Sequence, residues 1–302
     1  MNIKFLFFSV LINRPKSHVD ICIIIMNIMK ADLHNHSYYS DGVLSPTEVV
    51  NLASEAECDL FSLTDHDTTD GIAEAQLEAD KLNLHLVNGV EISALWRNMP
   101  IHILGLGIDT NNDILQTGLE HNQKLRKERA EKIALGLWRS GIKDALEKTQ
   151  SFSKTDMLTR THFAQMLINE GYCKDMKAVF RRYLTGKKPG GVRVEWEDYD
   201  EVVRWIHAAG GMAFIAHPFR YRMTHTKIKT MLNDFKCVLG DGIEIVTGSS
   251  SDEEIQLGNQ WAGKYNLLAT CGSDFHGWPN QRVRIGNLRE LPDTEKAVWR
   301  YL

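Results

Sequence analysis

Residues 29–36 read Met29-Lys30-Ala31-Asp32-Leu33-His34-Asn35-His36, and Asp41 follows five residues later. Alternate side chains at the end of a strand point the same way, so His34 and His36 can bind one metal ion while Asp41 approaches it from the loop. A pair of histidines at this spacing is weak support for a metal site by itself. The rest of the chain strengthens it, because short apolar runs followed by metal-binding side chains recur.

Seven short apolar runs of this kind divide the chain. They cover residues 29–33, 60–64, 84–90, 101–108, 212–216, 242–246 and 267–271. Helical patterns separate several of them, including Ser45 to Glu57, where Ser45 is a candidate N-cap and Pro46 the first helical residue, and Gly71 to Leu82. Strands that alternate with helices predict an α/β fold with a largely parallel sheet.

The polar residues in and after these runs form the candidate site. In a closed βα barrel the loops after the strands converge on one mouth, so side chains placed there lie close together. Any one of them could be an isolated polar residue at a strand end, but nine together are hard to explain in that way. The nine are His34, His36, Asp41, His66, Glu91, His102, His217, Asp274 and His276.

Between residues 120 and 193 the strand pattern stops and helical patterns replace it. Residues 121–193 contain 17 Lys and Arg against 7 Asp and Glu, a net charge of +10, while the remaining residues carry −14. This asymmetry favours a polyanionic ligand beneath a basic insert over a merely solvated surface. We therefore expect four segments: an atypical N-terminal extension (1–28), a first barrel part (29–119), a basic helical insert (120–193) and a second barrel part (194–302).

The ordered motifs resemble those of the polymerase and histidinol phosphatase (PHP) family from about residue 30 to 290. They are most similar to its bacterial branch of 3′,5′-nucleoside bisphosphate phosphatases and 5′-to-3′ exoribonucleases. The segments that carry this similarity are residues 64–69, 89–93, 102–106, 159–164, 182–187 and 272–276. The resemblance implies a distorted seven-stranded, TIM-like (β/α)7 barrel with an inserted helical domain, and a trinuclear metal centre.

The family pattern also implies which residues bind which ion. The first metal would be held by His34, His36, Glu91 and Asp274. Glu91 would bridge to a second metal, which His102 and His217 complete. The third would lie on Asp41, His66 and His276. Manganese is the first choice of divalent ion, with iron or zinc as alternatives, because mixed imidazole and carboxylate ligation suits all three.

Hydrolysis of a phosphate ester explains why such a cluster would be useful. An anionic nucleophile must approach an anionic phosphate, and three divalent ions offer +6 against −3 from the three carboxylates. Metal binding lowers the pKa of a bound water to about 7, so the expected nucleophile is a metal-bound hydroxide. The residues expected to hold it are Glu91, His34, Asp41 and His66. Asp67 is expected to support a ligand rather than to bind metal.

Basic residues of the insert are expected to bind the substrate's additional phosphate, because the planar guanidinium fork of arginine matches phosphate oxygens. The candidates are Arg160 and His162, with Arg126, Arg129, Lys187, Lys188 and, outside the insert, Arg220 as weaker members. Arg160 is the first choice, although surface solvation explains any single one about as well. Trp96, close behind Glu91 in sequence, is the candidate for stacking on a nucleobase.

The leading functional hypothesis is a hydrolase that removes the 3′-phosphate of nucleoside 3′,5′-bisphosphates, acts as a 5′-3′ exoribonuclease on 5′-monophosphorylated RNA, or does both. Nucleotides and RNA 5′ ends would be its partners. One alternative is a histidinol-phosphate phosphatase, and another is a non-catalytic PHP metal-binding module.

The remaining features concern the location of the protein. The five cysteines form no CxxC pair, which fits a reducing cytoplasm. The apolar runs at residues 5–12 and 21–29 are each shorter than the roughly 20 residues that a membrane-spanning helix needs. We therefore expect a cytoplasmic protein without membrane association, with a membrane anchor in the N-terminal extension as the alternative.

Overall fold

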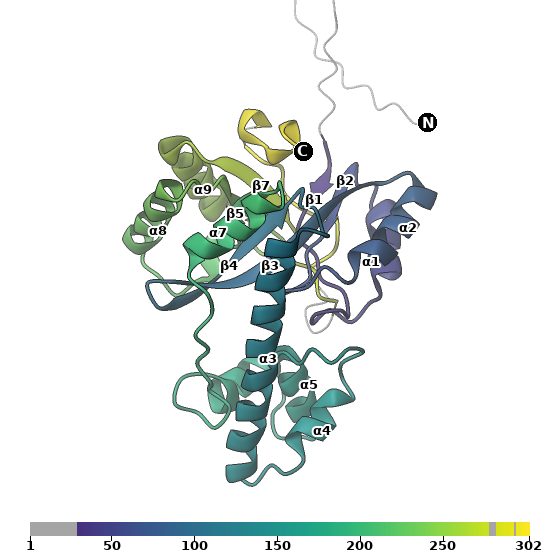
Figure 1. Ribbon diagram of the computed structural model, residues 1–302, viewed down its shortest axis with the longest axis vertical. Coiled ribbons are helices and arrows are strands. Elements are labelled where there is room, and N and C mark those ends of the chain that lie inside the picture. Colours follow the sequence, from purple (N-terminus) through teal and green to yellow (C-terminus); the bar gives the residue numbers. More distant parts are fainter. Residues whose placement is uncertain (1–28, 278–281, 293) are drawn as a thin grey trace, which may run out of the picture.

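The computed structural model describes residues 29–277, 282–292 and 294–302. The expected N-terminal extension, residues 1–28, lies outside the described residues. Figure 1 shows a sheet with helices around it at one end of the molecule and a smaller group of helices at the other. The long helix α3 (Asp113–Arg139) runs from the first part into the second.

The sheet contains seven strands in sequence order, and each overlaps one of the seven predicted apolar runs. The strands are β1 (Ala31–Asp32), β2 (Leu60–Leu63), β3 (His85–Trp96), β4 (Met99–Leu106), β5 (Met212–Ile215), β6 (Gly242–Thr247) and β7 (Leu268–Gly272). After β7 the chain returns to β1, where the Leu33 amide donates to the Cys271 carbonyl at 2.9 Å and the Asp274 amide donates to the His34 carbonyl at 2.8 Å. The sheet therefore forms a nearly closed barrel, and the predicted α/β barrel is confirmed.

The barrel is distorted at β4, which pairs antiparallel with both β3 and β5. Strand β3 continues to Trp96, and Arg97 and Asn98 then form a two-residue turn with φ angles of 49° and 63°. Positive φ at both turn residues suits the twist of a tight hairpin. A hairpin thus replaces one βα unit. Because β4 runs in the opposite direction, its first half lies at the barrel mouth and carries His102 there.

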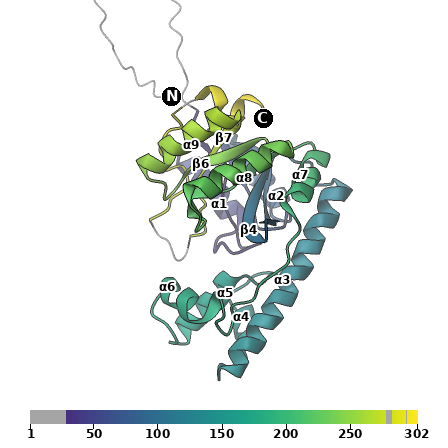
Figure 2. The same cartoon turned by 90° about the vertical axis from the view of Figure 1, so that its left-hand side faces the viewer.

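Five helices cover the barrel, with α1 and α2 on one side and α7 to α9 on the other (Figures 1 and 2). They are α1 (Pro46–Glu55), α2 (Ile72–Leu82), α7 (Tyr199–Ala208), α8 (His225–Cys237) and α9 (Asp252–Tyr265). The predicted N-cap of α1 is confirmed, because the Ser45 hydroxyl accepts from the Glu48 amide and the Glu48 carboxylate accepts from the Ser45 amide. Fully buried Ile92, Ile103 and Phe214 form part of the barrel core.

Residues 120–193, hereafter the helical layer, contain most of α3 and a set of shorter elements. These are α4 (Ala145–Gln150), α5 (Arg160–Asn169), α6 (Met176–Val179) and a π-helical turn (Phe180–Leu184). They pack around their own apolar core, which includes Ile133, Leu137, Phe163 and Leu167. Helix α3 passes residue 120 without a break, so the division of the chain at that residue stays a prediction. Of the helices in the described part of the chain, none combines the length and apolar character that a bilayer span requires.

Candidate metal centre and anion pocket

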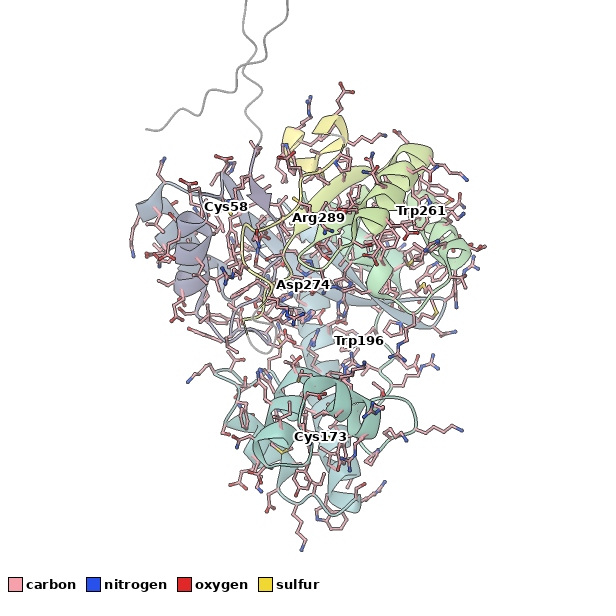
Figure 3. The ribbon with its side chains drawn as sticks, turned by 180° about the vertical axis from the view of Figure 1, so that it is seen from behind. Cys58, Cys173, Trp196, Trp261, Asp274 and Arg289 are labelled. Carbon is pink, nitrogen blue, oxygen red and sulfur yellow. The ribbon has the colours of Figure 1, made fainter. Side chains whose placement is uncertain are left out.

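All nine predicted ligands lie at the mouth of the barrel that faces the helical layer. Figure 3 shows Asp274 at this end of the barrel, with Trp196 between it and the helical layer. His34 and His36 follow β1, Asp41 lies in the loop before α1, and His66 follows β2. Glu91 lies within β3 and His102 within β4, while His217 follows β5 and Asp274 and His276 follow β7.

Glu91 lies at the centre of this group, with its side chain only 1% exposed. Its Oε2 atom lies 3.3 Å from His34 Nε2, 3.3 Å from His36 Nε2 and 2.9 Å from His66 Nδ1. Its Oε1 atom lies 2.9 Å from His102 Nδ1 and 2.9 Å from His217 Nε2. Burial alone would raise the pKa of Glu91, but His66, His102 and His34 hold it well below its usual range. Glu91 is therefore a carboxylate anion shared by five imidazoles.

Four of the donor atoms are spaced as ligands of a single ion would be. His34 Nε2 and His36 Nε2 lie 3.2 Å apart, and their distances to Glu91 Oε2 and Asp274 Oδ1 are 3.1 to 3.4 Å. Ligands about 2.1 Å from a common ion stand roughly 3.0 to 3.4 Å apart at neighbouring corners of an octahedron or tetrahedron. These four residues, the first predicted set, therefore fit a divalent metal ion.

The donors predicted for the third ion lie around Asp41. Asp41, His66, His276 and His36 each offer one donor atom, and these atoms lie within 4.8 Å of one another. Asp41 Oδ1 lies 3.2 Å from His276 Nε2 and 3.7 Å from His66 Nε2, yet this buried oxygen has no hydrogen bond. Burial lowers the pKa of His66 to about 3, so its imidazole is neutral and able to bind a cation. Buried polar atoms without partners are costly, and a metal ion would satisfy them.

The donors predicted for the second ion lie around Oε1 of Glu91. His102 Nδ1 and His217 Nε2 both approach Oε1, and His66 also lies close enough to Glu91 and His102 to share an ion with them. Burial lowers the pKa of His217 to about 4, which keeps its imidazole neutral. Two of the three predicted sets share Glu91, and the set around Asp41 reaches it through His66, whose Nδ1 lies 2.9 Å from Glu91 Oε2. His36 and His66 each belong to two of the groups that could hold an ion.

Two supporting carboxylates accompany the ligands. Glu244, on β6, accepts from the backbone amide of His217 at 2.7 Å and lies 2.9 Å from His34 Nδ1, which leaves Nε2 of His34 to face the other ligands. Burial lowers the pKa of His34, but Glu244 and Glu91 outweigh it and raise the pKa to about 10, so an ion that binds Nε2 of His34 would displace a proton from it. Glu244 is not among the residues predicted from the sequence. An acid within the apolar run 242–246 was the available signal. Asp65 accepts hydrogen bonds from Ser37 and Ser40 and so fixes the loop after His36.

A cavity of about 330 Å³ extends from the ligand cluster to the helical layer. Its lining includes Arg126, Arg129, Arg160, Arg193 and Arg220. The carboxylates in its lining are Asp41, Glu91 and Asp274, all at the ligand end. Arg129 Nε is buried without a hydrogen-bond partner. Burial, together with the charges of Arg160 and Arg126, lowers the pKa of Arg129 well below its usual range. Three of these arginines are paired, Arg126 with Asp67, Arg193 with Glu195 and Arg220 with Asp274. Arg129 and Arg160 have no carboxylate partner among the described residues, so they form the cationic part of the far end of the cavity.

Not all of the residues predicted to bind substrate line the cavity. Arg220 lines the cavity and forms an ion pair with Asp274. His162 is buried in the first turn of α5, where its Nδ1 accepts from the Thr159 amide, and it does not line the cavity. Lys187 is exposed and also lies outside the lining. In a sequence, a histidine that caps a helix and a lysine that faces water look the same as residues that bind an anion. The sequence therefore could not distinguish His162 and Lys187 from Arg160.

The prediction that Trp96 stacks on a nucleobase is wrong. Trp96 is buried in the barrel core and its Nε1 donates to Asp234 at 2.9 Å, so its ring has no face toward the cavity. The aromatic residues that line the cavity are Trp196 and Phe180, and neither was predicted from the sequence to do so. The guanidinium of Arg126 lies 5.4 Å from the centre of the Trp196 ring, and that of Arg160 lies 5.6 Å from the Phe180 ring.

Comparison with known proteins identifies the family. Residues 32–247 match the family model described as the PHP domain. The chain belongs to the PHP domain family. It is 41% identical over 273 residues to the 3′,5′-nucleoside bisphosphate phosphatase of Chromobacterium violaceum, a match that covers 90% of this chain and 95% of that protein. It is 38% identical over 273 residues to a 5′-3′ exoribonuclease of Haemophilus influenzae, covering 89% and 98%.

A solved structure supports the same assignment. A Chromobacterium violaceum protein described as an amidohydrolase with bound sulfate and no metal matches this PHP protein with a TM-score of 0.85 and 41% identity. The match covers 90% of this chain and 95% of that one. The family and the branch predicted from the sequence motifs are therefore confirmed.

Proposed function

We propose that this PHP protein is a metal-dependent phosphoesterase that hydrolyses the 3′-phosphate of nucleoside 3′,5′-bisphosphates and also degrades 5′-monophosphorylated RNA from its 5′ end. One observation carries the proposal: a single cavity has the ligand cluster at one end and, at the other, Arg129 and Arg160, which have no carboxylate partner among the described residues. A substrate with two phosphates offers one to each end. The names of the two similar proteins support this choice.

We further propose that the nine ligand residues hold three divalent ions, with manganese as the first choice. When bound, such ions supply an activated water and neutralise charge on the phosphate undergoing hydrolysis. The surrounding residues prepare the site, since Glu244 orients His34 and Arg220 pairs with the outer oxygen of Asp274. A reducing cytoplasm suits the four described cysteines, all of which are free.

The arginine end of the cavity would bind the phosphate that is not hydrolysed. Arg160 is the second of four consecutive residues, Thr159 to His162, that begin helix α5, and three of these line the cavity. The Thr159 and Thr161 amides already donate to capping side chains, so the helix start contributes only the partial positive charge of its dipole to the attraction for an anion. Histidinol phosphate has an ammonium group where the bisphosphate has its second phosphate, and these arginines would repel it.

The test is a comparison of substrates with the metal-loaded protein. We expect kcat/KM for adenosine 3′,5′-bisphosphate to exceed that for adenosine 3′-monophosphate by about 10- to 150-fold, because charge-assisted hydrogen bonds contribute about 1.5–3 kcal/mol. Histidinol phosphate should be a poor substrate. RNA with a 5′-phosphate should be degraded faster than the same RNA with a 5′-hydroxyl. Equal turnover of the two adenosine nucleotides, or a preference for histidinol phosphate, would contradict the proposal.

A further inference from the structure

The helical layer contacts a predicted metal ligand directly. The Thr161 hydroxyl, from the first turn of α5, donates to Asp41 Oδ2 at 2.8 Å. The other oxygen of the same carboxylate, Oδ1, faces His276 and His66 and accepts no hydrogen bond. Thr161 is itself held in place, because its amide donates to the capping hydroxyl of Thr159 at 3.1 Å. One oxygen of Asp41 is therefore fixed by the helical layer, and the other is left available for a cation.

A second contact reaches the loop that carries His66. The next residue, Asp67, is fully buried and adopts a left-handed backbone conformation with φ of 52°. Its carboxylate accepts from Arg126 Nε at 2.6 Å and from Asn122 Nδ2 at 2.8 Å, and its carbonyl accepts from Gln123 Nε2 at 2.9 Å. All three donors belong to α3 in the helical layer. Asp67 therefore anchors the His66 loop to α3, and its side chain makes no hydrogen bond to the His66 imidazole.

We propose that the helical layer is part of the metal centre as well as a cover over the substrate, with Thr161 and Arg126 as positioning residues that hold Asp41 and the His66 loop for ion binding. This inference rests on the proposed function only in assuming that Asp41, His66 and His276 bind an ion. Hydrogen bonds to a ligating carboxylate fix its orientation, and losing such a partner typically weakens metal affinity by about 10- to 100-fold.

The test is a Thr161→Val variant, which keeps the shape of the side chain and removes the hydroxyl. Metal is stripped with a chelator, and Mn²⁺ binding is then titrated by calorimetry, with the number of bound ions counted by elemental analysis. We expect one class of ion to bind about 10- to 100-fold more weakly than in the unaltered protein, while the remaining ions bind unchanged. Thr161→Ser, which retains a hydroxyl, should restore the affinity.

A matched control is available in the same layer. Thr149, in α4, is buried, its hydroxyl donates to the Ala145 carbonyl, and it is not part of the cavity lining. Thr149→Val should leave every manganese affinity unchanged. Unaltered manganese binding by Thr161→Val, or equal weakening in both variants, would overturn the inference. The proposed function fails separately, if the unaltered protein binds manganese but releases no phosphate from any nucleotide.

Discussion

Replacing Glu91 with glutamine is expected to remove nearly all phosphoesterase activity, by about 10³-fold or more. Both carboxylate oxygens of Glu91 face imidazoles, two on one side and three on the other. Glutamine has nearly the same shape but only one acceptor oxygen and no charge, so it cannot serve two sets of ligands at once. A loss of several kcal/mol of transition-state stabilisation corresponds to this factor, since each 1.36 kcal/mol is tenfold. Steady-state kinetics and elemental analysis of the purified variant measure it.

The control for this variant is Glu74→Gln, the same chemical change on helix α2. The Glu74 carboxylate accepts hydrogen bonds from Thr47 and lies outside the cavity. This variant should keep full activity and full metal content. If Glu91→Gln retained its metal and most of its activity, Glu91 could not be the shared ligand of the centre.

Replacing Arg160 with alanine is expected to lower kcat/KM for adenosine 3′,5′-bisphosphate by roughly 30- to 150-fold, mainly through KM. Arg160 lines the cavity and its pKa is lowered by burial and by Arg126, so an anion would gain more from pairing with it than with a solvated arginine. A charge-assisted hydrogen bond of about 2–3 kcal/mol gives this factor. Metal content should be unchanged, because Arg160 belongs to none of the groups that could hold an ion.

Arg181→Ala provides the comparison for Arg160. Arg181 is an exposed arginine of the same layer and does not line the cavity, so its removal should change KM little. Turnover of adenosine 3′-monophosphate, which lacks the distal phosphate, should fall much less in Arg160→Ala than turnover of the bisphosphate. Unchanged kinetics on both substrates would refute the role of Arg160.

The sequence was sufficient to predict the strands and the set of side chains at the barrel mouth. Each strand overlaps a short apolar run, and polar residues such as His34 and His217 follow those runs, so the parallel βα geometry brings them together. The hairpin between β3 and β4 was not predicted. Its signal, the turn residues Arg97 and Asn98, depends on φ angles that arginine adopts rarely and that no periodicity reveals.

The substrate end of the site was harder to predict, for a physical reason. An arginine in a helix has the same local pattern whether it faces water or a cavity, and only tertiary packing separates half-buried Arg129 and Arg160 from exposed Lys187. The same applies to the tryptophans. Trp96 follows a ligand closely in sequence but points into the core, whereas Trp196 comes from a distant segment and lines the cavity. Proximity along the chain gave no guide to proximity in space.

Manganese add-back to chelator-treated protein is the most direct test that the nine side chains form a metal centre that hydrolyses phosphate esters. Bound manganese and phosphate release from adenosine 3′,5′-bisphosphate would be measured in the same samples. We expect no release from the metal-free protein and release that rises with manganese occupancy until the sites are full. Undiminished release from metal-free protein, or filled sites without any release, would contradict this proposal.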